Sequence, residues 1–328
     1  MKIVIPKSDG KVDDRGLSLV QNPELTSLIH PIFSVDPNIP MERVLGHGTL
    51  FRVDPWDGCA TAFHVIEELL TLHGGQIALK PTPKIAALET PPIGYGTLPI
   101  IPAFWRPITG IFSCLSLDEK PFVSPKIRNF SELAAVLCPR GNAVRALEAK
   151  YLPLDLTGSI PRQGDKITAF GYADLDVDKQ GNGDDRPLEQ RLYRSDAIVV
   201  DVQKPDISSG RPWPLARVEA NWPGGMSGGP VFNQAGVVIG VVSTGIPGEN
   251  IGTAALFAGW DAGRNTFGRL DPLNPGWVQA FLALGSNDAI LEVSLTENDL
   301  VPLVATGAAK TVRRATVDLA SGDFMLRD

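Results

Sequence analysis

The sequence predicts an all-β fold, and three observations carry that prediction. The chain has 328 residues, of which 33 are glycine and 28 are proline, and it shows no clear internal repeat. Glycine and proline at this level favour many turns between short strands. A β-branched run at 237–243 is typical of a strand. The Asp57-Gly58 pair is a common hairpin-turn signal.

The expected elements follow in order along the chain. Residues 1–38 are expected to form an irregular N-terminal arm, and residues 44–53 form the first strand candidate. Further strands are expected where apolar or β-branched runs occur, at 59–63, 131–137, 166–172, 191–202, 237–243 and 253–257. The apolar spacing of 275–284, closed by a glycine, predicts a C-terminal helix. Residues 286–328 would be a short C-terminal extension.

Charge and composition exclude several classes of function. The net charge of -7 argues against a nucleic-acid partner, because such proteins carry basic patches. The N-terminus lacks the apolar run of about 7–15 residues that a signal peptide needs, and no window approaches the ~18 apolar residues of a membrane span. The three cysteines fit no metal motif and favour a reducing compartment. We therefore expect a cytoplasmic protein that binds no membrane.

The segment Pro223–Phe232 concentrates glycine around one serine, Ser227. A packed core rarely uses this composition, because glycine weakens strands and helices. Its physical use is a tight turn that projects a hydroxyl group and aims backbone N–H groups at one point, where they can hold an oxyanion. A plain glycine turn is the alternative interpretation of this segment by itself.

The order of residues along the chain narrows the chemistry. The Gly-x-Ser-x-Gly frame also occurs in α/β-hydrolases, but there the histidine follows the serine. Here all four histidines, at positions 30, 47, 64 and 73, precede Ser227. His64 follows a strand-like run and is the candidate general base, whereas the other three are interpreted as structural or surface residues.

Three segments, Thr61–Val65, Glu132–Ala134 and Gly225–Pro230, resemble in this order the motifs of the trypsin/chymotrypsin-like serine peptidases. The match is closest to the disulfide-poor bacterial branch and spans roughly residues 40–285. The resemblance implies a peptidase domain over 39–285, built of two six-stranded antiparallel β-barrels at about 39–150 and 151–285. The active site would lie between the barrels.

The resemblance also implies a mechanism. Ser227 would attack a peptide carbonyl, His64 would take its proton, and the N–H groups of Gly225 and Ser227 would form the oxyanion hole. No metal or organic cofactor is required. Glu132 stands where the family usually has aspartate, and it can orient the imidazole in the same way. Asp118 is the rival for the triad acid.

Further positions bear on control and specificity. Met226 occupies a position where secreted relatives carry an aspartate that pairs with a newly freed N-terminus, so we expect no such zymogen switch. The resemblance places substrate contacts at Asn221, Trp222, Ser243, Thr244 and Gly245. With no aspartate on the pocket floor, cleavage after small or medium apolar residues is expected. An acidic loop at 174–186 is interpreted as solvated and not as a calcium site.

Alternative functions stay open at this stage. A catalytically silent or partner-activated peptidase-like module could bind a polypeptide without turnover. Esterase or acyltransferase chemistry would use the same residues. The expected partners are a polypeptide substrate and a regulatory protein bound through the N-terminal arm or the C-terminal tail.

Overall fold

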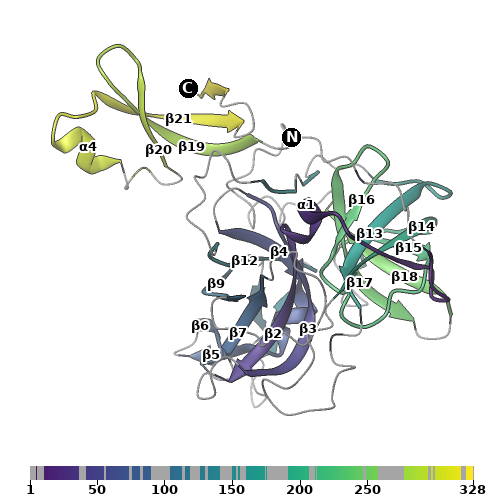
Figure 1. Cartoon of the computed structure of the whole chain (residues 1–328). Coiled ribbons are helices and arrows are strands. Elements are labelled where there is room, and N and C mark those ends of the chain that lie inside the picture. The colour runs from purple at the N-terminus through teal and green to yellow at the C-terminus, as the bar shows by residue number, and fades with distance from the viewer. Residues whose placement is uncertain are drawn as a thin grey trace.

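The architecture comes from a computed structural model (Figure 1). It describes 5, 11–36, 42–54, 57–73, 76–81, 84–89, 104–112, 115–118, 126–129, 132–140, 150–152, 154–155, 160–173, 175, 191–206, 211, 213–246, 249–257, 277–294, 297, 300–318 and 323–327. Strands dominate these residues, as the sequence predicts. Within them, no helix has the length and apolar character needed to cross a membrane.

Six strands close into a barrel in the second half of the chain. They are β13 (Lys166–Tyr172), β14 (Leu192–Gln203), β15 (Leu215–Glu219), β16 (Pro230–Phe232), β17 (Val238–Ile246) and β18 (Ile251–Leu256). Their order is β14-β13-β16-β17-β18-β15, and pairing of β14 with β15 closes the ring. β1 (Leu17–Leu19) adds to the outer side of β14. This sheet confirms the predicted second barrel.

The first half forms an open, curled sheet and not a closed barrel in the described residues. Its seven strands run in the order β8-β7-β2-β3-β4-β12-β9. They are β2 (Ile29–Asp36), β3 (Glu42–Arg52), β4 (Gly58–Ala62), β7 (Lys84–Leu88), β8 (Trp105–Pro107), β9 (Gly110–Phe112) and β12 (Leu133–Leu137). Together with the closed barrel, this curled sheet is consistent with a chymotrypsin-like two-barrel fold.

Short elements complete the main body. Two separate hairpins pair β5 (Leu70–His73) with β6 (Gln76–Leu79), and β10 (Leu115–Asp118) with β11 (Lys126–Asn129). Helix α1 (Pro23–Thr26) begins where the Asn22 side chain accepts N–H groups of the first turn, and helix α2 (Phe63–Glu67) follows β4.

The predicted helix at 275–284 is wrong, because Trp277–Leu284 is strand β19. It lies between β20 (Ile290–Ser294) and β21 (Thr311–Asp318), and β22 (Phe324–Leu326) forms the other edge of this four-stranded sheet. A short apolar run cannot distinguish a buried helix from a strand. Hydrogen bonding on both sides of β19 decided the outcome.

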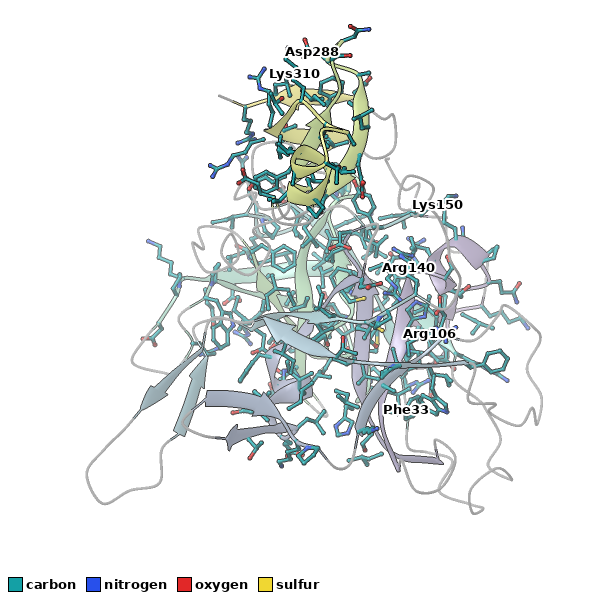
Figure 2. All side chains as sticks on the ribbon, turned by 90° about the vertical axis from the view of Figure 1, so that its left-hand side faces the viewer. Phe33, Arg106, Arg140, Lys150, Asp288 and Lys310 are labelled. Atoms are coloured by element: carbon teal, nitrogen blue, oxygen red, sulfur yellow. The ribbon has the colours of Figure 1, made fainter. Side chains whose placement is uncertain are left out.

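The C-terminal sheet and helix α4 (Val301–Ala305) form a separate group of elements in Figure 1. Asp288 and Lys310 lie in this group, away from Phe33 and Arg106 of the first sheet (Figure 2). Buried residues of β19 and β21, such as Leu282 and Val317, nevertheless join the main apolar cluster. The domain limits at 38 and 285 stay predictions. Paired strands lie on both sides of each limit: β2, before residue 38, pairs with β3, and β19, before residue 285, pairs with strands of the C-terminal extension.

Candidate active site

His64 is presented by the short helix α2 at the end of β4. The neighbouring side chains of Phe63, Val65 and Ile66 are buried and anchor the helix, whereas the His64 side chain is 35% exposed. The N–H of Phe63 donates to the carbonyl oxygen of Glu132 at 2.6 Å. The backbone that carries the histidine is therefore bonded directly to the backbone of the candidate acid.

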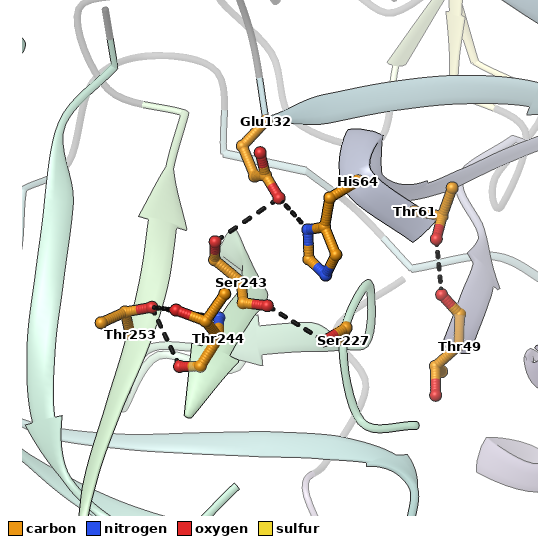
Figure 3. Close-up of polar contacts among 8 residues, drawn as sticks. All are labelled: Thr49, Thr61, His64, Glu132, Ser227, Ser243, Thr244 and Thr253. Carbon is orange, nitrogen blue, oxygen red and sulfur yellow. Dashed lines mark hydrogen bonds and ion pairs between the residues drawn. The ribbon is translucent and has the colours of Figure 1, made fainter. Parts of the chain in front are cut away.

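Strand pairing brings Glu132 to His64. Glu132 precedes β12, and β12 pairs with β4 in a register that sets Leu133 opposite Ala62. The Glu132 carboxylate contacts Nδ1 of His64 (Figure 3) and is only 5% exposed. A carboxylate at Nδ1 holds the proton there and leaves Nε2 free to accept another. Asp118 ends strand β10, and its side chain lies outside the described residues.

The loop before Ser227 is a tight turn that only glycine can form. The N–H of Met226 donates to the carbonyl of Pro223 at 3.2 Å, and Gly225 has φ +93°. A positive φ at the third residue of such a turn is the mark of a type II turn. Within the described part of the chain, the N–H groups of Gly225 and Ser227 donate no hydrogen bond. Both donors remain available for an oxyanion.

Close backbone contacts explain three glycines of this segment, Gly225, Gly228 and Gly229. A Cβ atom on Gly225 would lie 2.4 Å from the Tyr172 carbonyl oxygen. On Gly228 it would lie 2.3 Å from the Thr49 oxygen, and on Gly229 it would lie 1.9 Å from the Phe170 oxygen. No side chain fits at these distances, so packing against three backbone carbonyls requires glycine here in addition to the turn itself.

The Ser227 hydroxyl donates to the Ser243 carbonyl oxygen at 3.0 Å, and the described residues include no hydrogen bond between Ser227 and His64. The Ser243 hydroxyl in turn donates to the Glu132 carboxylate at 3.4 Å. Figure 3 shows His64 lying between Glu132 and the loop of Ser227. Hydrogen bonds of a catalytic site are often long or misaligned before substrate binds. Rotation of the Ser227 side chain would be needed to pair it with His64.

The predicted substrate-binding residues fall into two groups. Ser243, Thr244 and Gly245 lie on β17, where the Thr244 N–H and hydroxyl bond to the Thr253 hydroxyl at 3.0 and 2.8 Å. Asn221 is exposed and lines a hollow of about 680 Å³ that includes neither His64 nor Ser227. The structure therefore does not bring Asn221 to the catalytic residues through this hollow.

Trp222 lies next to the β17 segment. A Cβ on Gly245 would be 2.4 Å from the Trp222 carbonyl oxygen, and a Cβ on Gly252 would be 2.7 Å from the indole ring. The Trp222 side chain is 3% exposed and packs in the apolar core of the closed barrel. Where a primary pocket was expected, the Trp222 indole ring therefore lies packed against Gly252.

Sequence reasoning missed two polar side chains at this site. One is the Ser243 hydroxyl, because only its backbone was expected to act. The other is Thr49 of β3, whose hydroxyl donates to the Gly225 carbonyl at 2.7 Å. The only local signal was a threonine in a glycine-interrupted strand, which is too common to indicate a role.

His30 is excluded as a base by its surroundings. It is 1% exposed, and burial, with the nearby Arg52 cation, lowers the pKa of His30 to about 3. A histidine with such a pKa stays neutral near pH 7 and is removed from solvent. This agrees with its interpretation as a structural residue.

Comparison with known proteins adds a family to this geometry. Residues 128–241 match the family model of the trypsin-like peptidase domain. The matched stretch contains Glu132 and Ser227 and ends inside β17. This match supports, over residues 128–241, the trypsin-like serine peptidase family predicted from the sequence. His64 lies before the matched stretch, so its assignment depends on the contact with Glu132.

Several solved proteases are similar to this chain at low sequence identity. The inactive form of the Rv3671c protease is 15% identical, with a TM-score of 0.41, over 71% of this chain and 85% of that chain. Its active form from M. tuberculosis is 19% identical, with a TM-score of 0.39, over 77% and 89%. The protease Anisep from Arthrobacter nicotinovorans is 14% identical, with a TM-score of 0.43, over 70% and 90%. No curated protein matches the sequence.

Proposed function

We propose that this trypsin-like peptidase is a serine endopeptidase with a Ser227-His64-Glu132 triad. The observation that carries the proposal is the contact between the Glu132 carboxylate and Nδ1 of His64. A buried carboxylate on this nitrogen orients the ring and stabilises the imidazolium that forms during the reaction. The free N–H groups of Gly225 and Ser227 support the assignment of the oxyanion hole.

The reaction would begin when the Ser227 hydroxyl turns from the Ser243 carbonyl toward Nε2 of His64. The Ser227 oxygen attacks the peptide carbonyl while His64 takes the hydroxyl proton. The N–H groups of Gly225 and Ser227 bind the resulting oxyanion. His64 then gives the proton to the leaving amine, and a water molecule, deprotonated by His64, hydrolyses the acyl-enzyme. Neither a metal nor an organic cofactor takes part in these steps.

An extended polypeptide would bind along β17. Pairing of β16 with β17 ends at Pro230 opposite Val241, whereas β18 continues to pair as far as Ile246. In the described residues, the segment that starts at Ser243 is therefore open on one side. An open strand edge binds an extended peptide through main-chain hydrogen bonds. This supports a polypeptide substrate.

The side chain before the cleaved bond would be small. The Trp222 ring lies against Gly252, and the Trp222 backbone lies against Gly245, so little space is left between these segments. A pocket discriminates against a larger side chain by a clash that it cannot relieve. We therefore propose alanine-sized or slightly larger apolar residues at this position.

The test of this function is labelling with a fluorophosphonate probe, followed by mass spectrometry of peptides cut from an unstructured protein. We expect wild type to be labelled and to cut internal peptide bonds, and Ser227→Ala and His64→Ala to do neither. Labelling without peptide cleavage would favour an esterase or acyltransferase. A folded wild type that neither reacts nor cuts would favour the peptide-binding module.

We also propose that a regulatory protein binds the C-terminal extension. Eleven large apolar side chains are most exposed among the described residues, and seven of them lie between Ile290 and Leu326. Exposed apolar side chains gathered in one small unit are typical of an interaction surface. The variant Phe324→Ser should lower affinity for a captured partner without changing labelling of Ser227. Unchanged affinity would contradict the proposal.

A further inference from the structure

A single residue of the first sheet holds the loop that carries the nucleophile. The N–H of Thr49 donates to the Ser227 carbonyl oxygen at 2.8 Å. Its hydroxyl donates to the Gly225 carbonyl oxygen at 2.7 Å. Gly225 and Ser227 are the two residues whose N–H groups form the proposed oxyanion hole. Thr49 thus binds the carbonyl side of both residues and leaves their N–H groups free.

The position of Thr49 is itself tightly determined. The residue is 0% exposed and lies within β3, opposite Pro31 of β2. Its hydroxyl accepts the N–H of Tyr172 at 3.0 Å, and its own carbonyl accepts the Thr61 hydroxyl at 2.7 Å. Every polar group of Thr49 is therefore paired across the boundary between the two halves or within the first sheet. The hydroxyl cannot turn away without leaving a buried N–H group unpaired.

The loop needs such an anchor because of its composition. Glycine loses more conformational freedom on ordering than any other residue, so a glycine turn is inexpensive to distort unless other groups hold it. Met226 is 0% exposed and apolar, so it offers no charge that could hold the turn through an ion pair. The two hydrogen bonds from Thr49 are directed at the residues whose orientation matters most for catalysis.

We propose that Thr49 is a positioning residue that keeps the oxyanion loop assembled in the absence of a partner or of N-terminal processing. The proposal rests on the proposed peptidase function and deepens it. Thr49 does not touch the substrate; it acts by fixing the direction of the Gly225 and Ser227 peptide groups. Transition-state stabilisation by preorganised N–H groups depends on that direction.

The variant Thr49→Val tests the hydroxyl alone, because valine keeps the shape and the backbone N–H bond to Ser227. Losing one oxyanion donor lowers kcat by about 10²–10³, so a loosened loop should lower kcat by at least about tenfold. KM should change less than about twofold, since ground-state binding is retained. Thr49→Ser restores the hydroxyl and should recover most of kcat.

Tyr172→Phe is the matched control. It removes another buried hydroxyl bond between the two halves, from Tyr172 to the Ile29 carbonyl at 3.0 Å, without touching the carbonyls of the loop. We expect Tyr172→Phe to lower stability with kcat nearly unchanged. An equal fall of kcat in Tyr172→Phe and Thr49→Val would overturn the positioning role. Full activity of Thr49→Val would overturn it as well.

Hydrogen exchange separates this proposal from the proposed function. The hydrogen-bonded loop amides of Met226, Gly228 and Gly229 should exchange faster in Thr49→Val than in wild type or Tyr172→Phe, whether or not the protein turns over. Absence of probe labelling in wild type would reject the peptidase function, yet exchange would still decide whether Thr49 holds the loop. Unchanged exchange of these amides in Thr49→Val would reject the anchoring role.

Discussion

The two halves of the molecule contribute to the site by different means. The first sheet supplies His64 and Glu132, which meet through a side-chain contact across β4 and β12. The closed barrel supplies Ser227 on a glycine turn. A Cβ atom added to any of three of its glycines would lie only 1.9 to 2.4 Å from a backbone oxygen. One half therefore depends on the chemical identity of its side chains, and the other depends on the absence of side chains.

The interiors of the two halves also differ, because the first half buries titratable side chains. The core of the closed barrel consists of apolar side chains such as Val199, Met226 and Ile239. The first half also encloses His30 and the cation of Arg52, which is 0% exposed. Arg52 donates to the Cys138 carbonyl oxygen, and its Nε finds no partner in the described part of the chain. Buried polar groups make the first half more sensitive to pH and to single substitutions.

The largest fall in kcat is expected in the first half of the molecule, from the variant Glu132→Gln. The amide keeps the shape of the carboxylate but donates a hydrogen bond to Nδ1, which imposes the wrong tautomer on His64. Such a change in a triad lowers kcat by about 10⁴. Steady-state kinetics on a peptide substrate would measure it. Asp118→Asn is the control and should retain activity; the reverse pattern would make Asp118 the acid.

The variant Gly225→Ala tests the turn that the closed barrel supplies, and its expected effect is the second largest. A Cβ at this φ of +93° would lie 2.4 Å from the Tyr172 oxygen, so the turn must move. Loss of oxyanion geometry should lower kcat by about 10²–10³. Gly164→Ala is the matched control, because Gly164 has φ +88° and open space around its Cβ position. The control should cost about 1 kcal/mol of stability and no activity. Equal kcat losses in both variants would refute the backbone argument.

Specificity sharpens the comparison, because Trp222 belongs to the closed barrel. Replacing its ring in Trp222→Ala should open space beside Gly252 and raise kcat/KM for substrates with leucine or phenylalanine before the cleaved bond. We expect a gain of about 10–100-fold relative to alanine substrates. Peptide-library profiling would measure it. Trp213→Ala removes another buried indole and should leave the preference unchanged; an unchanged preference in Trp222→Ala would reject the proposed pocket.

The smallest effect concerns the pH dependence of the first half. The pKa of His30 falls from 6.5 to about 3 on folding, through burial and then through Arg52. The unfolded state therefore takes up the extra proton, and stability is lost as the pH falls below 6.5 toward about 3. The contribution approaches about 1.4 kcal/mol per pH unit. Denaturant unfolding at several pH values should show a flatter slope in His30→Leu; an unchanged slope would contradict this account.

The sequence by itself predicted the β-rich class, the residues proposed for the chemistry, and the positions of β3, β4, β12, β13, β14, β17 and β18. Strands β13, β14 and β18 fall within two residues of their predicted ranges, because β-branched runs and turn residues are local signals. The glycines around Ser227 and the Thr-Ala-x-His run are local signals too. They predicted Ser227 as the nucleophile and His64 as the base, and both roles stay proposals.

Only the tertiary structure decided which residues meet. The pairing of β12 with β4 brought Glu132 to His64, and hydrogen bonding on both sides turned 277–284 into a strand instead of a helix. Thr49 reaches Gly225 across 176 positions of sequence, and the Trp222 ring lies against Gly252. Register and packing between distant segments depend on the whole chain, so no local pattern could have predicted these contacts.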